Sequence, residues 1–305
     1  MKLRPALLLS LLFALWVPIK ASARCPGPVA LQVLGSGGPI ADDDRASSGY
    51  LLWLNGEARL LVDVGGGVFL RFGQSGARIE DLDAIVLTHL HTDHSADLPA
   101  LLKSGYFSNR TRPLPIIGPS GAEGWPGIED YLEGLFAPRR GVYRYLAGFL
   151  DGGDGLFETP AMEIDAKLRE PITAFGTKDL RVRLVGVEHG SVPALGVLIE
   201  AEGRRIAITG DQNDDNPAYA RMIEGADLLV ADHAIPQDAG RVAKRLHLTP
   251  QGIAGLAGEA GAKQLLLSHL MHRSLVALDE SRKIIADAYK GPVSLADDLA
   301  CVRLD

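Results

Sequence analysis

The sequence has little of three features that would mark particular classes of protein: runs of basic residues, aromatic residues and cysteines. Its formal net charge is -7 and it has no run of Lys and Arg, which argues against binding nucleic acid by neutralising many phosphates. Aromatic residues make up 6% of the chain, but hydrophobic residues make up 47%, enough for the core of a globular domain. We therefore expect a globular protein that does not have nucleic acid as its partner.

The two cysteines, Cys25 and Cys301, stand near opposite ends of the chain. A pair this far apart lacks the spacing of a metal site. In an oxidising compartment the two could form a disulfide, and the alternative is two unrelated thiols. Both alternatives stay open, because spacing in the sequence does not show geometry.

The first 23 residues have the pattern of a signal peptide. Lys2 and Arg4 precede an apolar stretch at residues 6–17, and the small residues Ala-Ser-Ala follow at 21–23. The apolar stretch is shorter than the roughly twenty residues that cross a membrane. We expect a periplasmic or secreted protein with no stable membrane anchor after removal of residues 1–23, and a single mature domain at 24–305.

The order of the expected elements predicts the fold class. Apolar runs typical of strands lie at residues 29–34, 49–54, 59–63, 84–87, 180–187, 196–200, 205–209, 228–231 and 264–267. Helical patterns lie at residues 68–74, 98–107, 127–136, 218–224, 250–260 and 279–289. Strands that first come close together and then alternate with helices predict a layered α/β sandwich. The less regular residues 110–177 are expected to form a cap insertion.

A dense group of polar residues, His89, His91, Asp93 and His94, follows the expected strand at 84–87. Buried polar groups need partners, and four packed this closely would have to satisfy mainly one another. Metal ions resolve that conflict, because neutral imidazole and carboxylate are common zinc ligands. The alternative is a solvated polar turn before a helix. The pattern favours a metal site.

Three further candidate ligands, His189, Asp211 and His269, each follow an apolar run. Polar residues at the ends of several strands are typical of a site at one edge of a sheet. Taken singly, a histidine at a strand end is more often a surface residue. Together with the first group, the three give seven ligands, which suits two zinc ions that share one bridging carboxylate.

This pattern of residues resembles the metallo-β-lactamase superfamily. The match is to its H-x-H-x-D-H motif at residues 89–94, followed by a downstream His, Asp and His in the order of that superfamily. The resemblance implies a four-layer αββα sandwich with the metal site at one edge of the sheets. It also implies two divalent ions, zinc first, with manganese or iron as alternatives. One ion would be held by His89, His91 and His189, the other by Asp93, His94 and His269, and Asp211 would bridge them.

Within the superfamily, the sequence is similar to the ribonuclease Z, arylsulfatase and class II phosphodiesterase group. The similarity lies in a glycine turn at 34–38, a motif at 188–196, and the H-x-T motif at 247–249. By this resemblance His247 assists the leaving group and Asp232 orients it. The alternative for His247 is a solvent-exposed residue just before a helix that starts at Thr249. The glycine turn is interpreted as a tight turn that lets loops approach the metals.

These observations predict an exported dinuclear-metal hydrolase, first a phosphodiesterase or related ester hydrolase acting on a small-molecule ester. A hydroxide that bridges the ions would attack, with Asp93 orienting it. An arylsulfatase or a β-lactamase or lactonase-type hydrolase is the alternative. A ribonuclease Z-type endoribonuclease ranks below these, because the chain looks exported and lacks a long basic arm. A di-iron redox protein also ranks lower, since His91 stands where such relatives typically carry Glu. A homodimer is left open.

Overall fold

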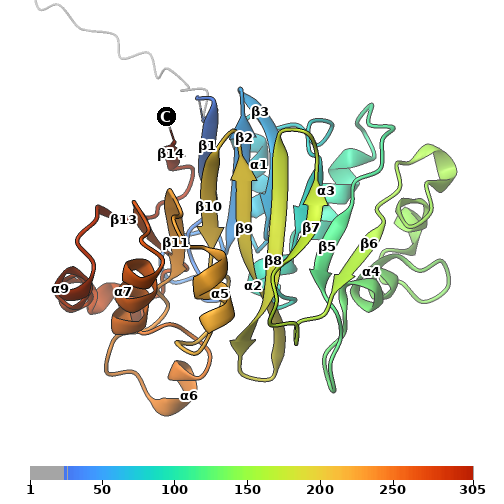
Figure 1. The fold of residues 1–305 in the computed structure, drawn as a ribbon. Helices are drawn as coiled ribbons and strands as arrows, with labels where there is room; N and C mark the ends of the chain where they lie inside the picture. Colours follow the sequence, from blue (N-terminus) through green and yellow to red (C-terminus); the bar gives the residue numbers. More distant parts are fainter. Residues whose placement is uncertain (1–23, 26, 305) are drawn as a thin grey trace, which may run out of the picture.

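The computed structural model describes residues 24–25 and 27–304, so the predicted signal peptide lies outside the described residues. Two sheets of seven strands face each other, and helices cover the outer face of each (Figure 1). The strand order is β14-β1-β2-β3-β4-β5-β6 in the first sheet and β13-β12-β11-β10-β9-β8-β7 in the second. The predicted four-layer αββα sandwich is therefore confirmed.

The strands of each sheet follow the chain in two halves. The first sheet contains β1 Val29–Gly35, β2 Gly49–Leu54, β3 Glu57–Val62, β4 Ala84–Val86, β5 Ile116–Pro119, β6 Ala161–Ile164 and β14 Cys301–Arg303. The second contains β7 Ile172–Gly176, β8 Leu180–His189, β9 Val192–Ala201, β10 Arg204–Ile208, β11 Leu228–Asp232, β12 Leu265–Ser268 and β13 Val293–Leu295.

The helices are short, and none in the described part of the chain has the length and apolar character to cross a membrane. They are α1 Val68–Gln74, α2 Thr92–Ser95, α3 Leu98–Gly105, α4 Ile128–Phe136, α5 Pro217–Met222, α6 Arg241–Lys244, α7 Pro250–Glu259, α8 His272–Val276 and α9 Leu278–Ala288. Two 3₁₀ segments, η1 Arg144–Phe149 and η2 Gly153–Gly155, follow α4.

The alternation of side chains in β1 illustrates how the layers form. Val29, Leu31 and Val33 point into the core between the two sheets. Ala30 and Leu34 point the other way, into the core beneath α1, α3 and α4. Successive residues of a strand face opposite sides, so a strand between two layers must be apolar on both. A third core lies between the second sheet and α5, α7 and α9.

Residues 110–177, which were expected to form a cap insertion, supply strands and a helix of the sandwich. Strands β5 and β6 complete the first sheet, and β7 forms the edge of the second. Between them, α4 and η1 bury Ile128, Leu132 and Phe149 in the core on the outer face of the first sheet. These strands have only four or five residues each, and β5 and β7 contain Gly or Pro, so the sequence pattern is too short to reveal them.

Strand direction sets the place of the candidate site. In the first sheet β3, β4, β5 and β6 run parallel, and in the second β10, β11, β12 and β13 run parallel. Strand β8 is antiparallel to β9, which is antiparallel to β10, so β8 ends at the same edge as β10. The carboxyl ends of β3, β4, β8, β10, β11 and β12 therefore bring their following residues to one edge of the sandwich.

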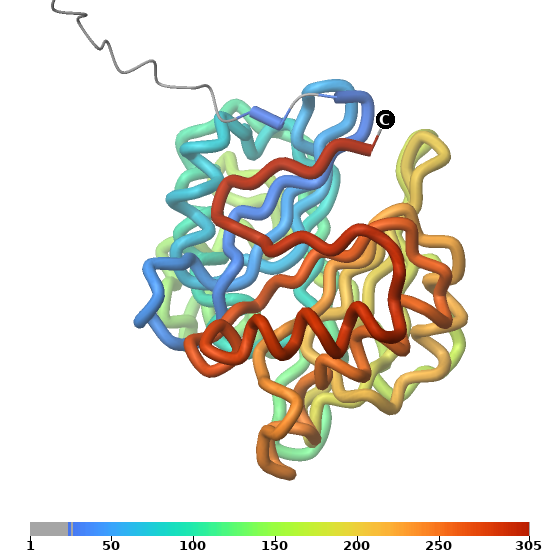
Figure 2. The backbone as a smooth tube through the Cα atoms, turned by 90° about the vertical axis from the view of Figure 1, so that its left-hand side faces the viewer, coloured from blue at the N-terminus to red at the C-terminus, as the bar shows by residue number. Residues whose placement is uncertain are grey.

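Cys25 and Cys301 form a disulfide, the first of the two alternatives, and their Cα atoms lie 5.5 Å apart. Strand β14 pairs antiparallel with β1, Gln32 opposite Cys301, which brings the two ends of the chain together. Figure 2 shows the C-terminal stretch crossing from the second half of the sandwich to the first, where it lies beside β1.

Replacing both cysteines by serine should lower the free energy of unfolding by about 2–5 kcal/mol, because the bond links residues 276 apart and limits the unfolded chain. Urea denaturation of the oxidised wild type and of the double variant measures the difference. Wild type under reducing conditions is the control and should resemble the variant. Equal midpoints for oxidised wild type and variant would contradict the prediction.

Candidate metal centre

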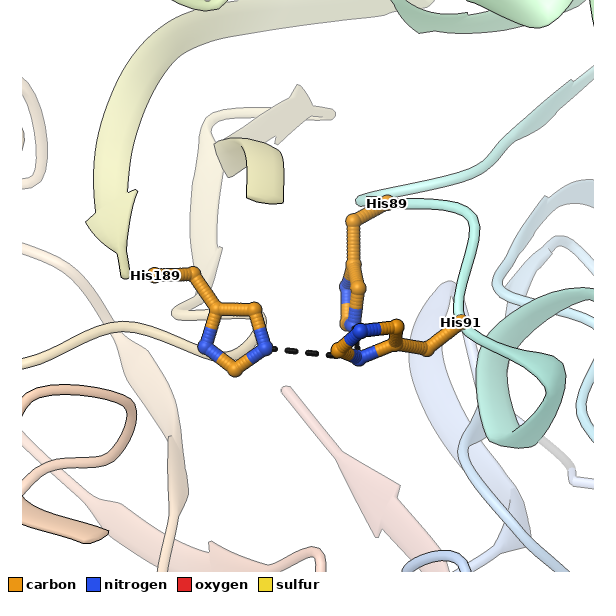
Figure 3. Close-up of side chains that lie close together, drawn as sticks. All are labelled: His89, His91 and His189. Atoms are coloured by element: carbon orange, nitrogen blue, oxygen red, sulfur yellow. Dashed lines mark hydrogen bonds between the residues drawn. The ribbon is translucent and has the colours of Figure 1, made fainter. Parts of the chain in front are cut away.

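Three histidines form the first cluster at the sheet edge (Figure 3). His89 and His91 lie in the loop after β4, and His189 is the last residue of β8. His91 Nδ1 lies 3.1 Å from His89 Nε2 and 3.4 Å from His189 Nε2. Ring nitrogens that converge from two sheets in this way can share one metal ion.

A hydrogen bond from Nδ1 of His189 determines that Nε2 of the same ring faces the cluster. His189 Nδ1 donates a hydrogen bond to the carbonyl oxygen of Leu246 at 2.8 Å. A carbonyl can only accept, so Nδ1 carries the proton and Nε2 of the neutral ring presents a lone pair. Burial lowers the pKa of His89, His91 and His189, which favours the neutral imidazoles that bind metals.

The second cluster consists of Asp93, His94, Asp211 and His269, all buried. His269 Nε2 lies 3.2 Å from Asp93 Oδ2 and 3.3 Å from Asp211 Oδ1. His94 Nε2 lies 3.4 Å from the same oxygen of Asp211. Helix α2 starts directly after His91, and this turn places Asp93 and His94 on the inner side of the loop.

Asp211 lies between the two clusters. Its Oδ1 faces the second cluster, while its Oδ2 lies 3.9 Å from His89 Nε2 and 3.8 Å from His189 Nε2. The residue follows β10 and its glycine turn, where Gly210 has a φ of 58°. A carboxylate with one oxygen toward each group of imidazoles is the arrangement that a bridging ligand needs.

A strand-end carboxylate that the sequence did not single out as a functional residue, Asp63, holds His94 in place. Asp63 Oδ2 accepts from His94 Nδ1 at 2.8 Å, which leaves His94 Nε2 for the cluster. Asp63 also accepts from the backbone and the hydroxyl of Thr88, at 2.7 and 2.9 Å. Its position after β3, between Val62 and Val64 and just before three glycines, was the available signal.

Metal ions fit the donor atoms of these clusters. His94 Nε2 and Asp211 Oδ1 are buried and have no hydrogen-bond partner among the described residues, although both point into the second cluster. Burying such atoms without partners is costly, and a shared cation would satisfy them. The fold and the His/Asp clusters together indicate a dinuclear metal site.

The charges of the second cluster also favour a cation. Burial raises the pKa of Asp93, but His94 and His269 outweigh it and bring the pKa to about 2. Burial lowers the pKa of His269, but Asp211 and other carboxylates outweigh it and raise the pKa to about 9. The carboxylates are therefore ionised and favour positively charged groups beside them, such as the protonated ring of His269. A divalent cation binding there would displace protons from the imidazoles.

His247 is not the solvent-exposed residue of the alternative interpretation, because the structure buries it beside both clusters. Its Nδ1 donates to Asp232 Oδ2 at 2.7 Å, and its ring centroid lies 5.5 Å from that of His189 and 5.6 Å from that of His269. Burial lowers the pKa of His247, but the charge and hydrogen bond of Asp232 raise it more. Asp232 ends β11, and His247 precedes Thr249, the N-cap of α7.

The glycine turn approaches the clusters as expected. A Cβ on Gly38 would lie 2.8 Å from Cε1 of His269, so only glycine fits there without a shift. Gly38 also donates from its backbone to the carbonyl oxygen of Leu270 at 3.2 Å. The turn therefore closes over His269 after β12.

Among the described residues, the seven predicted ligands, together with His247 and Asp232, lie at one edge of the sandwich. Their individual roles stay predictions. Sequence reasoning missed Asp63 and also Trp125, whose ring centroid lies 5.6 Å from that of His91. Trp125 lies in an irregular loop, and nothing in its local pattern pointed to the site.

Comparison with known proteins identifies the family. The sequence matches the family described as "Beta-lactamase superfamily domain" over residues 58–270, which includes all seven predicted ligands. The chain therefore belongs to the metallo-β-lactamase superfamily, and proteins named Ribonuclease Z are similar to it over nearly its whole length. Ribonuclease Z of Mycolicibacterium paratuberculosis is 29% identical over 290 residues, 91% of this chain and 99% of the relative. Ribonuclease Z of Mycobacterium bovis is 29% identical over 287 residues, 90% and 98% of the two chains.

Solved structures have the same fold. The metallo-β-lactamase fold protein YhfI from Bacillus subtilis superposes with a TM-score of 0.68 at 25% identity, covering 90% of this chain and 99% of its own. Human tRNase Z, short form, superposes with a TM-score of 0.67 at 22% identity, covering 90% and 98%. The superfamily and these relatives support a metal-dependent hydrolase.

Two expectations from the sequence are wrong: that nucleic acid is not the partner, and that ribonuclease Z-type activity ranks below hydrolysis of a small-molecule ester. Relatives named Ribonuclease Z align with nearly the whole chain. The physical reason is that net charge averages over the whole surface, whereas RNA responds to local charge. Here α6 carries exposed Arg241 and Lys244, with exposed Arg245 just after it, two residues before His247.

Proposed function

We propose that this protein is a metal-dependent phosphodiesterase of the ribonuclease Z type, which hydrolyses a phosphodiester bond in RNA. The observation that carries the proposal is the position of Asp211 between two ligand clusters, with the His247–Asp232 pair beside them. The relatives named Ribonuclease Z support RNA as the substrate.

Seven residues would hold the cofactor. His89, His91 and His189 would bind one divalent ion, Asp93, His94 and His269 the other, with Asp211 shared. The preponderance of imidazole supports zinc, with manganese or iron as alternatives. Bound there, the ions supply positive charge to the phosphate oxygens and make water a stronger acid near neutral pH.

His247 would hold the proton that the leaving oxygen needs. With Nδ1–H donated to Asp232, the ring has only Nε2 left for a substrate, and the raised pKa favours the protonated ring. Asp232 itself accepts at Oδ1 from the backbone of Ala234 at 2.9 Å, which fixes the orientation of its carboxylate. Asp232 is thus a positioning residue for His247.

The direct test uses the mature protein loaded with zinc or manganese. A transfer-RNA precursor with a 3′ extension, an unstructured RNA and a DNA of the same sequence are incubated with it, and the cleavage ends are mapped. We expect cleavage of RNA at a defined linkage, lost after chelation and restored by the metal. If the folded, metal-loaded protein cleaves none of the RNAs, the proposal is wrong.

Helix α6 is expected to contact the RNA backbone. Replacing Arg241, Lys244 and Arg245 by alanine should weaken RNA binding and reduce the slope of log affinity against log salt by about 2, because each lost phosphate contact on a single strand contributes roughly 0.7. Fluorescence anisotropy at several salt concentrations measures both.

The matched control removes three cations, Lys178, Arg181 and Arg204, that lie around the other ends of β8 and β10. This control should keep the wild-type slope. An unchanged slope in the α6 variant, or an equal loss in the control, would contradict a local role of α6.

We also propose that the enzyme works outside the cytoplasm, in the periplasm or after secretion. The signal-like pattern of residues 1–23 and the Cys25–Cys301 disulfide support this, since such bonds persist in oxidising compartments. Residues 1–23 fused to a reporter that is active only after export would test it. A reporter that stays in the cytoplasm would argue against the proposal.

A further inference from the structure

The indole of Trp125 lies at the rim of the metal centre and is not part of the hydrophobic cores described above. Trp125 is in the loop between β5 and α4, partly exposed, and its ring meets that of His91 edge-on at 64° with centroids 5.6 Å apart. The other described tryptophan, Trp53, is buried, and its Nε1 donates to Gln32 at 3.0 Å. Trp125 therefore combines an aromatic surface open to solvent with direct contact to a candidate ligand.

The loop holds Trp125 in a defined position. Ala122 and Trp125 exchange two backbone hydrogen bonds, at 3.1 and 2.9 Å, which close a tight turn. The loop leads into α4, where Tyr131 donates its hydroxyl to the carbonyl oxygen of Ser95 at 2.9 Å and so ties α4 to α2. An aromatic ring that is already fixed loses little entropy when a ligand stacks on it.

A hollow lies beside the loop, lined by the residues on either side of His189 in the chain. A cavity of about 190 Å³ lies between residues 120–122 of this loop, residues 165–169 after β6, and the turn at 190–193 that follows His189. Lys167 and Arg169 are exposed on its rim. Arg169 pairs with Glu188, whereas the side chain of Lys167 extends to solvent. The hollow thus offers room and a cation next to the first histidine cluster.

We propose that Trp125 is a stacking platform for a base of the RNA next to the scissile phosphate. The inference rests on the proposed function. Single-stranded RNA is commonly bound by bases stacked on aromatic side chains, and the interaction tolerates any base because each has a π face. The phosphate chain would pass from the metal centre toward the hollow and Lys167, with one base on the indole.

Kinetics with an RNA substrate show whether Trp125 binds a base by stacking or only supports His91. Trp125→Ala should raise KM roughly tenfold and leave kcat nearly unchanged, because stacking one base contributes about 1–3 kcal/mol. Trp125→Phe, which keeps an aromatic face, should stay within a few-fold of wild type. Phe107→Ala, which removes an exposed aromatic ring past the end of α3, is the control and should have no effect.

Intrinsic fluorescence gives a readout other than activity. Stopped-flow mixing of the metal-loaded protein with oligoadenylate RNA should quench tryptophan emission before cleavage, and the quench should vanish in Trp125→Phe. An abasic ribose-phosphate chain of the same length should not quench, because it has no base to stack.

The outcomes distinguish the two proposals. If wild type cleaves RNA but Trp125→Ala keeps its KM, or the abasic chain quenches equally, the stacking role is wrong and the proposed function stands. If Trp125→Ala loses kcat and bound metal with KM unchanged, Trp125 only supports His91, which also overturns the inference. If wild type neither binds nor cleaves any RNA, the proposed function itself fails, and the inference with it.

Discussion

Replacing Asp211 with alanine should abolish hydrolysis and lower the metal content of the protein. Its two oxygens face different clusters, so one substitution removes a donor from both. It also leaves His94 and His269 without the carboxylate that lies 3.4 and 3.3 Å from their Nε2 atoms. Loss of a residue that only orients a ligand typically costs about 10–100-fold, and a shared ligand should cost more than about 100-fold in activity.

Activity on RNA and metal content by mass spectrometry measure this effect. Asp215→Ala removes an exposed carboxylate four residues further along the same loop and should change neither quantity. Thermal unfolding shows whether Asp211→Ala still folds. A folded Asp211→Ala protein with two bound ions and wild-type turnover would refute the assignment of Asp211 as the shared ligand.

Four of the ligands could be predicted because they are close together in the sequence. His89, His91, Asp93 and His94 lie within six residues, in the loop after β4 and in α2, and so many polar groups packed together indicate a metal site. His189, Asp211 and His269 are far apart in the chain, and they were found because each one lies where an apolar run ends. The parallel strands β10, β11 and β12, and β8 antiparallel to β9, bring these ends to one edge. Family resemblance supplied the pairing of these ligands with particular ions.

Residues that act through another residue were harder to find. Asp63 is a single carboxylate at a strand end, a common feature, and only the structure reveals its 2.8 Å hydrogen bond to His94. Trp125 sits in a turn with no periodic pattern, so its contact with His91 depends on how the loop folds back. Such roles arise from tertiary contacts, which no local pattern encodes.

The sequence predicted those parts of the fold that have a strong local pattern. The strands expected at 49–54 and 59–63 are present as the neighbouring antiparallel strands β2 and β3, joined by a turn at Asn55-Gly56 in which both residues have a positive φ. Strands β5, β6 and β14 have only three or four residues, and they form because they pair with neighbouring strands of the sheet. The expectation about nucleic acid was wrong for a related reason: net charge averages over the whole chain and does not show where cations gather, as the exposed cations of α6 do.

His247→Ala should slow hydrolysis of RNA by about 10²–10⁴-fold, the usual contribution of a positioned acid. The loss should be much smaller for a phosphodiester with a p-nitrophenolate leaving group, which departs without a proton. The exposed His272 of α8 gives a matched control, since His272→Ala removes an imidazole outside the clusters. An equal loss on both kinds of substrate would contradict a role for His247 at the leaving oxygen.

The pH profile tests the pair further. Burial lowers the pKa of His247, and Asp232 raises it by more, so the protonated ring persists to higher pH than an ordinary imidazole. Activity should then fall as pH rises through this raised pKa. Asp232→Asn removes the negative charge, lowers the pKa of His247, and should shift the alkaline limb of the kcat profile to lower pH. An alkaline limb that stays in place in Asp232→Asn, or that survives unchanged in His247→Ala, would mean that another group titrates there.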